Sequence, residues 1–238
     1  MLFIGDGSWR ATGNEFLRFF IRLGGLRPHH HVLDVGCGIG RMAMPLTRYL
    51  SPRGSYHGFD IVPAGIDWST QHISSHFPNF TFELANIRNE HYNPNGTQSA
   101  SEFVFPYASG TFDFVFLTSV FTHMVPADFE QYLGQISRVI RSGGRALITF
   151  FLINDVASGS IRRGKSVLGF TPHANHFFVM DQKDPEAAVA FDERYIRSTM
   201  ANYGLTLLEP IHYGSWSGRK RFLSFQDIIV VEKSNQPT

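Results

Sequence analysis

The chain has 238 residues, of which 43% are hydrophobic and 17% are charged, and its net charge is +1. These values are those of a globular protein, and the length suits one domain. The charge is too low for the electrostatic footprint that a nucleic-acid partner usually requires. No apolar run approaches the roughly 20 residues that cross a bilayer, and no signal peptide is recognisable. We therefore expect a cytoplasmic protein with neither a nucleic-acid nor a membrane partner.

Helical and extended patterns alternate along most of the chain. Apolar residues at helical spacing, with proline or aspartate at several starts and glycine at several ends, predict helices at residues 12–24, 40–50, 63–76, 126–142 and 192–203. Short apolar runs predict strands at residues 32–36, 55–59, 80–84, 112–118, 145–152, 205–208 and 227–231. We expect the Gly143–Gly144 pair to cap the fourth helix.

This order predicts an α/β fold, with a seven-stranded, mostly parallel sheet and helices on both of its faces. Since no helix separates the last two strands, the last strand should be antiparallel. We expect a single domain over residues 1–238, with a helical extension at residues 1–30 and residues 86–110 as a long loop. Residues 153–191 break the pattern and are expected to form an inserted, lid-like segment over the substrate; a surface excursion or an oligomer contact is the alternative. Residues 3–9 are expected to cover the binding site.

The end of the first strand carries the most informative motif. There the apolar run Val32–Val35 contains Asp34, and glycines follow at positions 36, 38 and 40. Glycine tolerates positive φ angles and lets a ligand approach the backbone closely. A dinucleotide site needs G-x-G-x-x-G, so the third glycine comes one residue too early for that motif. The carboxylate of Asp34 also suits a cationic amine better than a pyrophosphate. The alternative is a turn that only packs the strand on the following helix.

At these residues the chain resembles the class I S-adenosylmethionine-dependent methyltransferases, whose first motif is (D/E)-x-G-x-G-x-G. The likeness extends over residues 32–152 and includes the segment Ser119–His123 of bacterial small-molecule methyltransferases. It implies a Rossmann-like fold and S-adenosyl-L-methionine as cofactor, with S-adenosyl-L-homocysteine as product. The cofactor residues that it implies in the first motif are Asp34, Gly36, Cys37, Gly38 and Gly40.

Three further positions follow the next strands. Asp60 ends the second strand, where a carboxylate can accept hydrogen bonds from both ribose hydroxyls; the alternative is a helix cap or a surface carboxylate. The resemblance places Ile61 on the adenine face, Asn86 and Ile87 at the adenine edge and ring, and Thr118 beside the methionine part of the cofactor. Family members more often have aspartate where this chain has Asn86.

His123 is the candidate catalytic residue. A hydroxyl acceptor benefits from a general base, and histidine is the usual one; the alternative is a histidine that holds the turn through a backbone hydrogen bond. Candidate substrate contacts lie in the insertion and in the loop between the last two strands: His173, His176, Tyr213, Trp216 and Arg219. An ordered surface excursion or hairpin loop is the alternative there. We expect no metal, because the carboxylate that metal-dependent members carry after the fourth strand is missing.

The sequence thus predicts a methyltransferase that acts on a small molecule, most readily at a hydroxyl oxygen of a natural product or sugar. An N-methyltransferase, or a non-catalytic subunit that binds S-adenosylmethionine, remains an alternative. A homo-oligomer is compatible with the sequence.

Overall fold

The computed structural model describes residues 8–89 and 92–234. We expected residues 3–9 to cover the binding site, but residues 3–7 of that segment lie outside the described residues. None of the helices within the described part of the chain is long and apolar enough to cross a membrane.

The main sheet has seven strands in the order β10-β11-β5-β4-β1-β2-β3. The strands are β1 (His31–Val35), β2 (Ser55–Asp60), β3 (Phe80–Leu84), β4 (Phe112–Leu117), β5 (Ile140–Phe150), β10 (Leu205–His212) and β11 (Asp227–Lys233). Neighbours pair in parallel, except that β11 is antiparallel to both β10 and β5. The expected seven-stranded α/β sheet with an antiparallel last strand is therefore confirmed.

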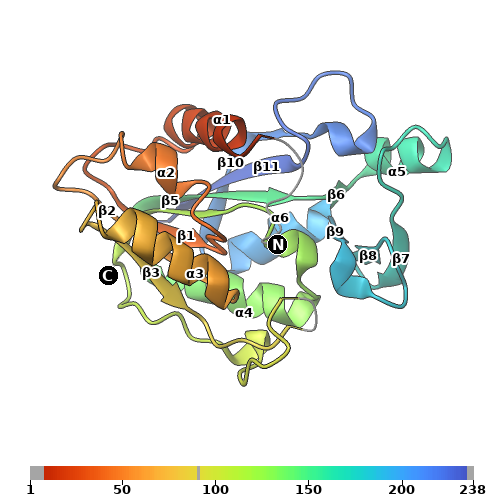
Figure 1. The fold of residues 1–238 in the computed structure, drawn as a ribbon. Coiled ribbons are helices and arrows are strands. Elements are labelled where there is room, and N and C mark those ends of the chain that lie inside the picture. The colour runs from red at the N-terminus through yellow and green to blue at the C-terminus, as the bar shows by residue number, and fades with distance from the viewer. Residues whose placement is uncertain (1–7, 90–91, 235–238) are drawn as a thin grey trace.

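Helices cover both faces of this sheet (Figure 1). The helices are α1 (Trp9–Arg22), α2 (Ala43–Leu46), α3 (Pro63–Ser69), α4 (Pro126–Val139), α5 (Asp155–Arg162) and α6 (Glu193–Asn202). The short helical turns are the π-helical η1 (Thr70–Ser74) and the 3₁₀ turns η2 (Ala100–Glu102), η3 (Phe121–His123), η4 (Pro185–Ala187) and η5 (Ser215–Ser217).

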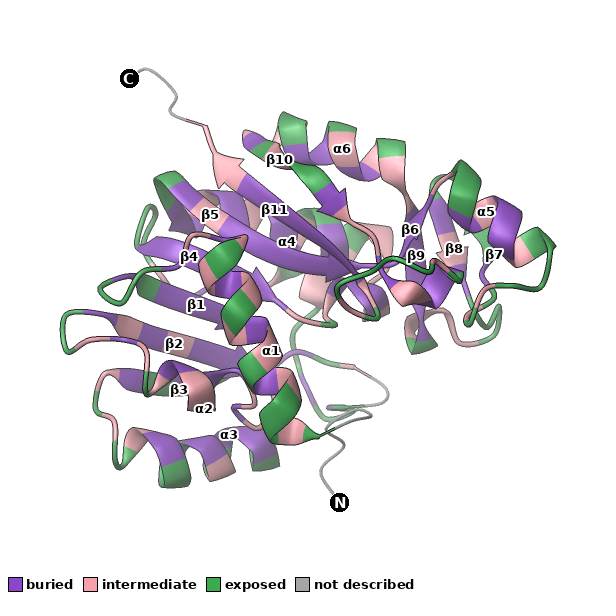
Figure 2. Cartoon of the chain, turned by 90° about the horizontal axis from the view of Figure 1, so that it is seen from above, coloured by how far each residue is buried: buried purple, intermediate pink, exposed green. Residues whose placement is uncertain are grey.

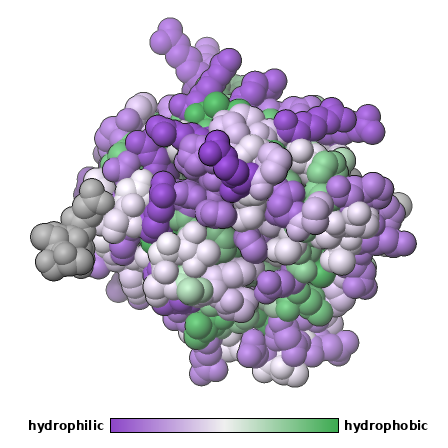
Figure 3. Space-filling view, turned by 90° about the vertical axis from the view of Figure 1, so that its left-hand side faces the viewer, coloured by the Kyte–Doolittle hydropathy of each residue, from purple (hydrophilic) through white to green (hydrophobic). Residues whose placement is uncertain are grey.

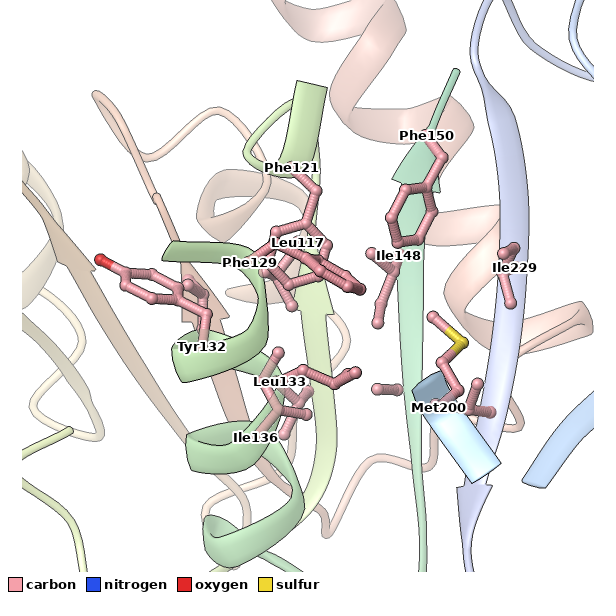
Figure 4. Packing of buried hydrophobic residues seen from close by; sticks show 14 of the residues in the cluster. Leu117, Phe121, Phe129, Tyr132, Leu133, Ile136, Ile148, Phe150, Met200 and Ile229 are labelled. Atoms are coloured by element: carbon pink, nitrogen blue, oxygen red, sulfur yellow. The ribbon is translucent and has the colours of Figure 1, made fainter. Parts of the chain in front are cut away.

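Each face of the sheet has its own hydrophobic cluster. On one face, Phe20 of α1 and Ile66 of α3 pack against residues such as Phe114 of β4. On the other, α4 and α6 contribute Phe129, Leu133, Ile136 and Met200, which meet Leu117, Ile148 and Ile229 of the strands (Figure 4). The central strands β1, β4 and β11 are largely buried while the helices keep exposed outer sides, as the amphipathic patterns require (Figure 2). On the face in Figure 3, hydrophilic residues cover most of the surface and hydrophobic ones gather in small patches.

Two local expectations were wrong. The helix expected over residues 40–50 is confined to α2, and turns follow it. The Gly143–Gly144 pair does not cap α4, which ends at Val139. The pair lies inside β5, where the pairing register with β4 shifts and Gly143 has a φ of 71°. Glycine is therefore needed for a strand irregularity rather than for a helix end.

The inserted segment has a regular structure that its sequence did not reveal. It contains β6 (Leu152–Ile153), β7 (Thr171–Ala174), β8 (Phe177–Val179) and β9 (Val189–Asp192), which form a second sheet in the order β6-β9-β8-β7. Because β6 follows β5 after one residue, this sheet stands beyond the carboxyl end of β5 (Figures 1 and 2).

Candidate active site

A cavity of about 730 Å³ opens at the carboxyl ends of β1, β2 and β4. Its volume falls within the roughly 300–1,000 Å³ of small-molecule sites, and its place is the one where parallel α/β sheets bind ligands. The lining comes from the segments after β1, β2, β3 and β4, from the first turns of α4 and from the insertion. Eight of the ten predicted cofactor residues line it: Asp34, Gly36, Cys37, Gly38, Asp60, Ile61, Ile87 and Thr118.

The glycine turn forms one end of the cavity. The backbone N–H groups of Gly36 and Cys37 both donate to the carbonyl oxygen of Phe59, at 2.9 and 3.0 Å, and so fix the turn to β2. Gly36 and Gly38 have φ angles of 79° and 55°. A Cβ added at Gly38 would meet no atom within 4 Å. The backbone there is open to a ligand, as the sequence motif predicted.

Asp60 supports this turn directly. Its Oδ2 accepts from the N–H of Gly38 at 2.7 Å, and its Oδ1 accepts from the N–H of Val62 at 2.9 Å. Burial raises the pKa of this carboxyl, and the backbone N–H groups of Gly38, Val62 and Ile61 oppose the rise. A carboxylate has about four acceptor positions, so acceptor capacity remains for a hydroxyl group of a ligand. Asp60 does not cap α3, whose N-cap is Val62, and it faces the cavity rather than solvent.

Asp34 lies at the floor of the cavity and is fully buried. Its Oδ2 accepts from the hydroxyl of Tyr56 at 2.6 Å, whereas its Oδ1 is buried with no hydrogen-bond partner within the described part of the chain. Burial raises the pKa of Asp34 to about 8, against the lowering effect of the Tyr56 hydroxyl. A buried acceptor without a partner is costly, so this oxygen fits the ammonium group of an amino-acid ligand. Together with the open backbone at Gly38, it makes this end of the cavity fit S-adenosylmethionine.

The raised pKa predicts how stability depends on pH. The unfolded carboxyl titrates near 3.8, so from about pH 4 to pH 8 only the folded state holds the Asp34 proton. The contribution of Asp34 to the free energy of unfolding is therefore complete below pH 4 and lost as pH rises through about 8. In ligand-free Asp34→Asn this decline should be smaller, as measured by thermal unfolding at stepped pH. Equal slopes in the wild type and the variant would contradict the assignment.

Two predicted cofactor residues do not line the cavity. Gly40, with a φ of 71°, lies against the helical segment, where an added Cβ would meet Ile73 Cδ1 at 2.6 Å. Its role is close packing. The exposed side chain of Asn86 donates from Nδ2 to the hydroxyl of Thr97 at 2.8 Å, and its backbone is paired with the same loop. The expectation that Asn86 reads the adenine edge is corrected, because this loop bond turns the amide away; Arg88 and Asn89 line the cavity instead.

His123 lines the same cavity. Val120, three residues before it, packs against Gly36 of the glycine turn. The Nδ1 of His123 pairs with the carbonyl oxygen of Glu186 at 2.9 Å. A carbonyl oxygen only accepts, so Nδ1 is the donor in this hydrogen bond. The backbone hydrogen bond of the alternative interpretation thus exists, but it ties η3 to η4 of the insertion and leaves the ring in the cavity wall.

The two histidines of the insertion do not reach the cavity. His173 lies on β7, whose residues are all exposed, and its Nδ1 pairs with Gln182 Oε1 at 2.7 Å. His176 occupies a turn with a φ of 62° and stacks on the ring of Tyr195. The second sheet fills its inner side with buried residues such as Phe177, so the polar histidines face outwards. Their expected role as substrate contacts is corrected.

The loop between the last strands is also structural. Trp216 is fully buried, and its indole N–H donates to Asp227 Oδ2 at 2.8 Å, so its ring is not available to a substrate. The hydroxyl of Tyr213 donates to Glu193 Oε2 at 2.9 Å, and the guanidinium of Arg219 lies 4.2 Å from the centre of the Tyr213 ring. None of Tyr213, Trp216 and Arg219 lines the cavity. The alternative of an ordered loop is therefore the correct one.

Several cavity residues were missed by the sequence analysis: Arg41, Arg88, Asn89, Tyr92, Asp128, Tyr132 and Glu186. The sequence could have indicated Asp128, because it lies in the first turn of the helix that follows His123. It could not have indicated Glu186, because no pattern in the neighbouring residues predicts the turn η4. Within the described ranges, 8–89 and 92–234, no three histidine, cysteine, aspartate or glutamate side chains are grouped so as to hold a metal ion.

Comparison with known families decides the identity of the fold and of the donor chemistry. A family model described as a methyltransferase domain matches residues 26–159, which is more than half of the chain. The chain belongs to the class I S-adenosylmethionine-dependent methyltransferases. The matched residues include the glycine turn, Asp60 and His123.

Solved structures agree with this assignment of the methyltransferase fold. A Pyrococcus horikoshii protein superposes with a TM-score of 0.63 at 16% identity, covering 97% of this chain and 93% of that chain. A Methanosarcina mazei S-adenosylmethionine-dependent methyltransferase gives 0.57 at 17% identity, covering 89% and 95%. The Burkholderia thailandensis 1,6-didemethyltoxoflavin N1-methyltransferase, solved with its substrate and S-adenosylhomocysteine, gives 0.59 at 16% identity, covering 95% and 80%. At these identities the likeness shows the fold alone.

Proposed function

We propose that this methyltransferase transfers a methyl group from S-adenosylmethionine to a hydroxyl oxygen of a small molecule. The observation that carries the proposal is that one cavity contains both the donor end, with Asp34, Gly38 and Asp60, and the ring of His123. The bound donor supplies an activated methyl group that needs no metal ion. An enclosed site then has to align the acceptor oxygen and exclude water.

In this proposal His123 is the general base. The carbonyl oxygen of Glu186 fixes the proton on Nδ1, so Nε2 takes up the proton of the acceptor hydroxyl as the oxygen–methyl bond forms. Asp34 holds the ammonium group of the donor, and Asp60 holds the ribose hydroxyls. Leu168, Met180 and Glu186 of the insertion border the cavity, which supports a role for residues 153–191 in enclosing the acceptor.

The first test is calorimetric titration of the whole chain with S-adenosylmethionine and S-adenosylhomocysteine, with NAD as the control ligand. We expect micromolar binding of the two sulfur compounds and none of NAD. Transfer of labelled methyl groups to a panel of alcohols, phenols, sugars and amines then tests the acceptor. Methylation of amines alone would refute the hydroxyl assignment, and donor binding without transfer to any member would favour a non-catalytic subunit.

A further inference from the structure

Besides the predicted donor residues, the cavity is lined by polar side chains that come from distant parts of the chain. Asn89 follows β3, Asp128 and Tyr132 lie on α4, and Glu186 lies in η4 of the insertion. Asn89 and Glu186 meet through a hydrogen bond of 3.1 Å from Nδ2 to Oε2, although 97 positions separate them. We refer to Asn89, Asp128, Tyr132 and Glu186 as the acceptor wall.

Two carboxylates of the acceptor wall influence one another. Burial and the charge of Glu186 together raise the pKa of Asp128 to about 6, against the lowering effect of the backbone N–H of Ser101. Carboxylates only accept hydrogen bonds, and a ligand that donates to both would offset their mutual repulsion. A ligand of this wall must therefore present several donors.

The hydroxyl of Tyr132 gives an independent indication of a ligand. The residue is only 3% exposed, lines the cavity and makes no hydrogen bond to any described residue. Figure 4 shows its oxygen pointing away from the other labelled residues of the hydrophobic cluster. Burial raises its pKa, as do the charges of Asp128 and of Asp60 at the donor end, so it remains a neutral hydroxyl between the two halves of the cavity. Because the residue lines the cavity, a ligand oxygen can pair with this hydroxyl.

The mixture of charges narrows the class of ligand. Arg88 lines the same cavity and supplies a positive charge near the carboxylates of Asp128 and Glu186. The ligand therefore does not need an ammonium group of its own. An anionic acceptor would be repelled by both carboxylates. The ring of Tyr92, whose centre lies 6.4 Å from that of His123, adds a flat apolar surface. Neutral hydroxyl groups, which both donate and accept, match this combination best.

We propose that the acceptor wall binds a polyhydroxylated ring, such as one unit of a sugar, and presents one of its hydroxyls to His123. Asp128 and Glu186 accept hydrogen bonds from two ring hydroxyls, and Tyr132 pairs with a third oxygen close to the donor. The inference rests on the proposed hydroxyl methylation and specifies its substrate class. Asp128, Tyr132 and Glu186 are then specificity-determining residues.

The test uses the whole chain saturated with S-adenosylhomocysteine and a panel of methyl hexopyranosides and methyl 6-deoxyhexopyranosides. Binding is followed by ligand-observed saturation-transfer NMR, so this readout does not depend on activity. Methyl transfer from labelled S-adenosylmethionine is measured for the same glycosides, with catechols, simple alcohols and primary amines alongside. We expect saturation transfer to some glycosides and methylation of the same ones.

Variants then locate the contacts. Asp128→Asn, Glu186→Gln and Tyr132→Phe should each raise KM for the glycoside about tenfold, the effect of losing one hydrogen bond, and leave the donor Kd unchanged. Glu102→Gln removes an exposed carboxylate outside the cavity and should change neither value. Thermal unfolding verifies that each variant is folded.

The outcomes separate this inference from the proposed function. Methylation of catechols or simple alcohols, with no glycoside bound, would overturn the sugar inference and leave hydroxyl methylation standing. Methylation of amines alone would overturn the proposed function. Glycoside binding that survives all three substitutions unchanged would remove the acceptor wall from recognition.

Discussion

Substitution of His123 by alanine is expected to lower kcat about 100-fold or more, because a positioned general base contributes roughly 10²–10⁴-fold to a proton-transfer step. The donor Kd should remain within a factor of two, since His123 forms no part of the glycine turn or of the Asp60 site. The measurement is steady-state methyl transfer over a range of pH, with the donor Kd taken from calorimetry. In the variant, the rise of kcat with pH that a titrating base produces should disappear.

A second substitution distinguishes a base from a positioning residue. His123→Asn retains an N–H donor for the carbonyl oxygen of Glu186, to which His123 Nδ1 is bound in the native protein. Asparagine is not basic, so it can hold η3 against η4 but cannot accept the acceptor proton. If His123 is the base, the asparagine variant should be as slow as the alanine variant. Recovery of activity in His123→Asn would show that the histidine only positions the insertion.

Loss of the Asp60 carboxylate is expected to weaken donor binding about 100-fold. Hydrogen bonds to a charged group contribute about 1.5–3 kcal/mol each, so two bonds to ribose hydroxyls amount to about 3 kcal/mol or more. Calorimetry with S-adenosylhomocysteine on Asp60→Asn measures this loss. Asp67→Asn, an exposed carboxylate of α3, is the matched control and should bind as the wild type does.

Asp60 also holds the N–H groups of Gly38 and Val62, so a weaker turn has to be separated from a lost ribose contact. A 2′,3′-dideoxy analogue of S-adenosylhomocysteine makes this separation. If Asp60 binds the hydroxyls, the analogue should bind the wild type and the variant with nearly equal affinity. A further large loss on combining the variant with the analogue would refute the ribose assignment and leave Asp60 as a support of the turn.

The sequence predicted those parts of the site that depend on neighbouring residues. The alternation of strands and helices predicted the seven-stranded sheet. The helix start at Asp192 is confirmed, because its Oδ1 accepts from the backbone N–H groups of Arg194 and Tyr195. Three glycines with positive φ angles are a local property of the chain, so the turn beside Asp34 was predictable. The prediction that Gly40 and Asn86 line the cavity was wrong. Gly40 packs against Ile73, and the side chain of Asn86 bonds to Thr97, and neither contact is visible in the local sequence.

Substrate-facing residues were harder to predict because aromatic and basic side chains serve the core as well as a ligand. Trp216 looked available in a polar loop, yet a buried carboxylate, Asp227, accepts from its indole and from the N–H groups of Gly214 and Leu152. This network joins the loop to β11 and to β6, and Trp216 packs in a cluster with Phe151 and Phe170. Composition alone does not distinguish such a tryptophan from one that stacks on a substrate.

By itself, the sequence determined the class of fold, the glycine turn and the place of Asp60 and His123 in the cavity, because backbone conformation and hydrophobic periodicity act over a few residues. Only the tertiary structure decided which further side chains line the cavity. The bond between Asn89 and Glu186 spans 97 positions, and the charge of Glu186 reaches Asp128 because the second sheet stands beyond the end of β5. Contacts of that range arise when separate elements pack on a common core, and no local pattern in the chain records them.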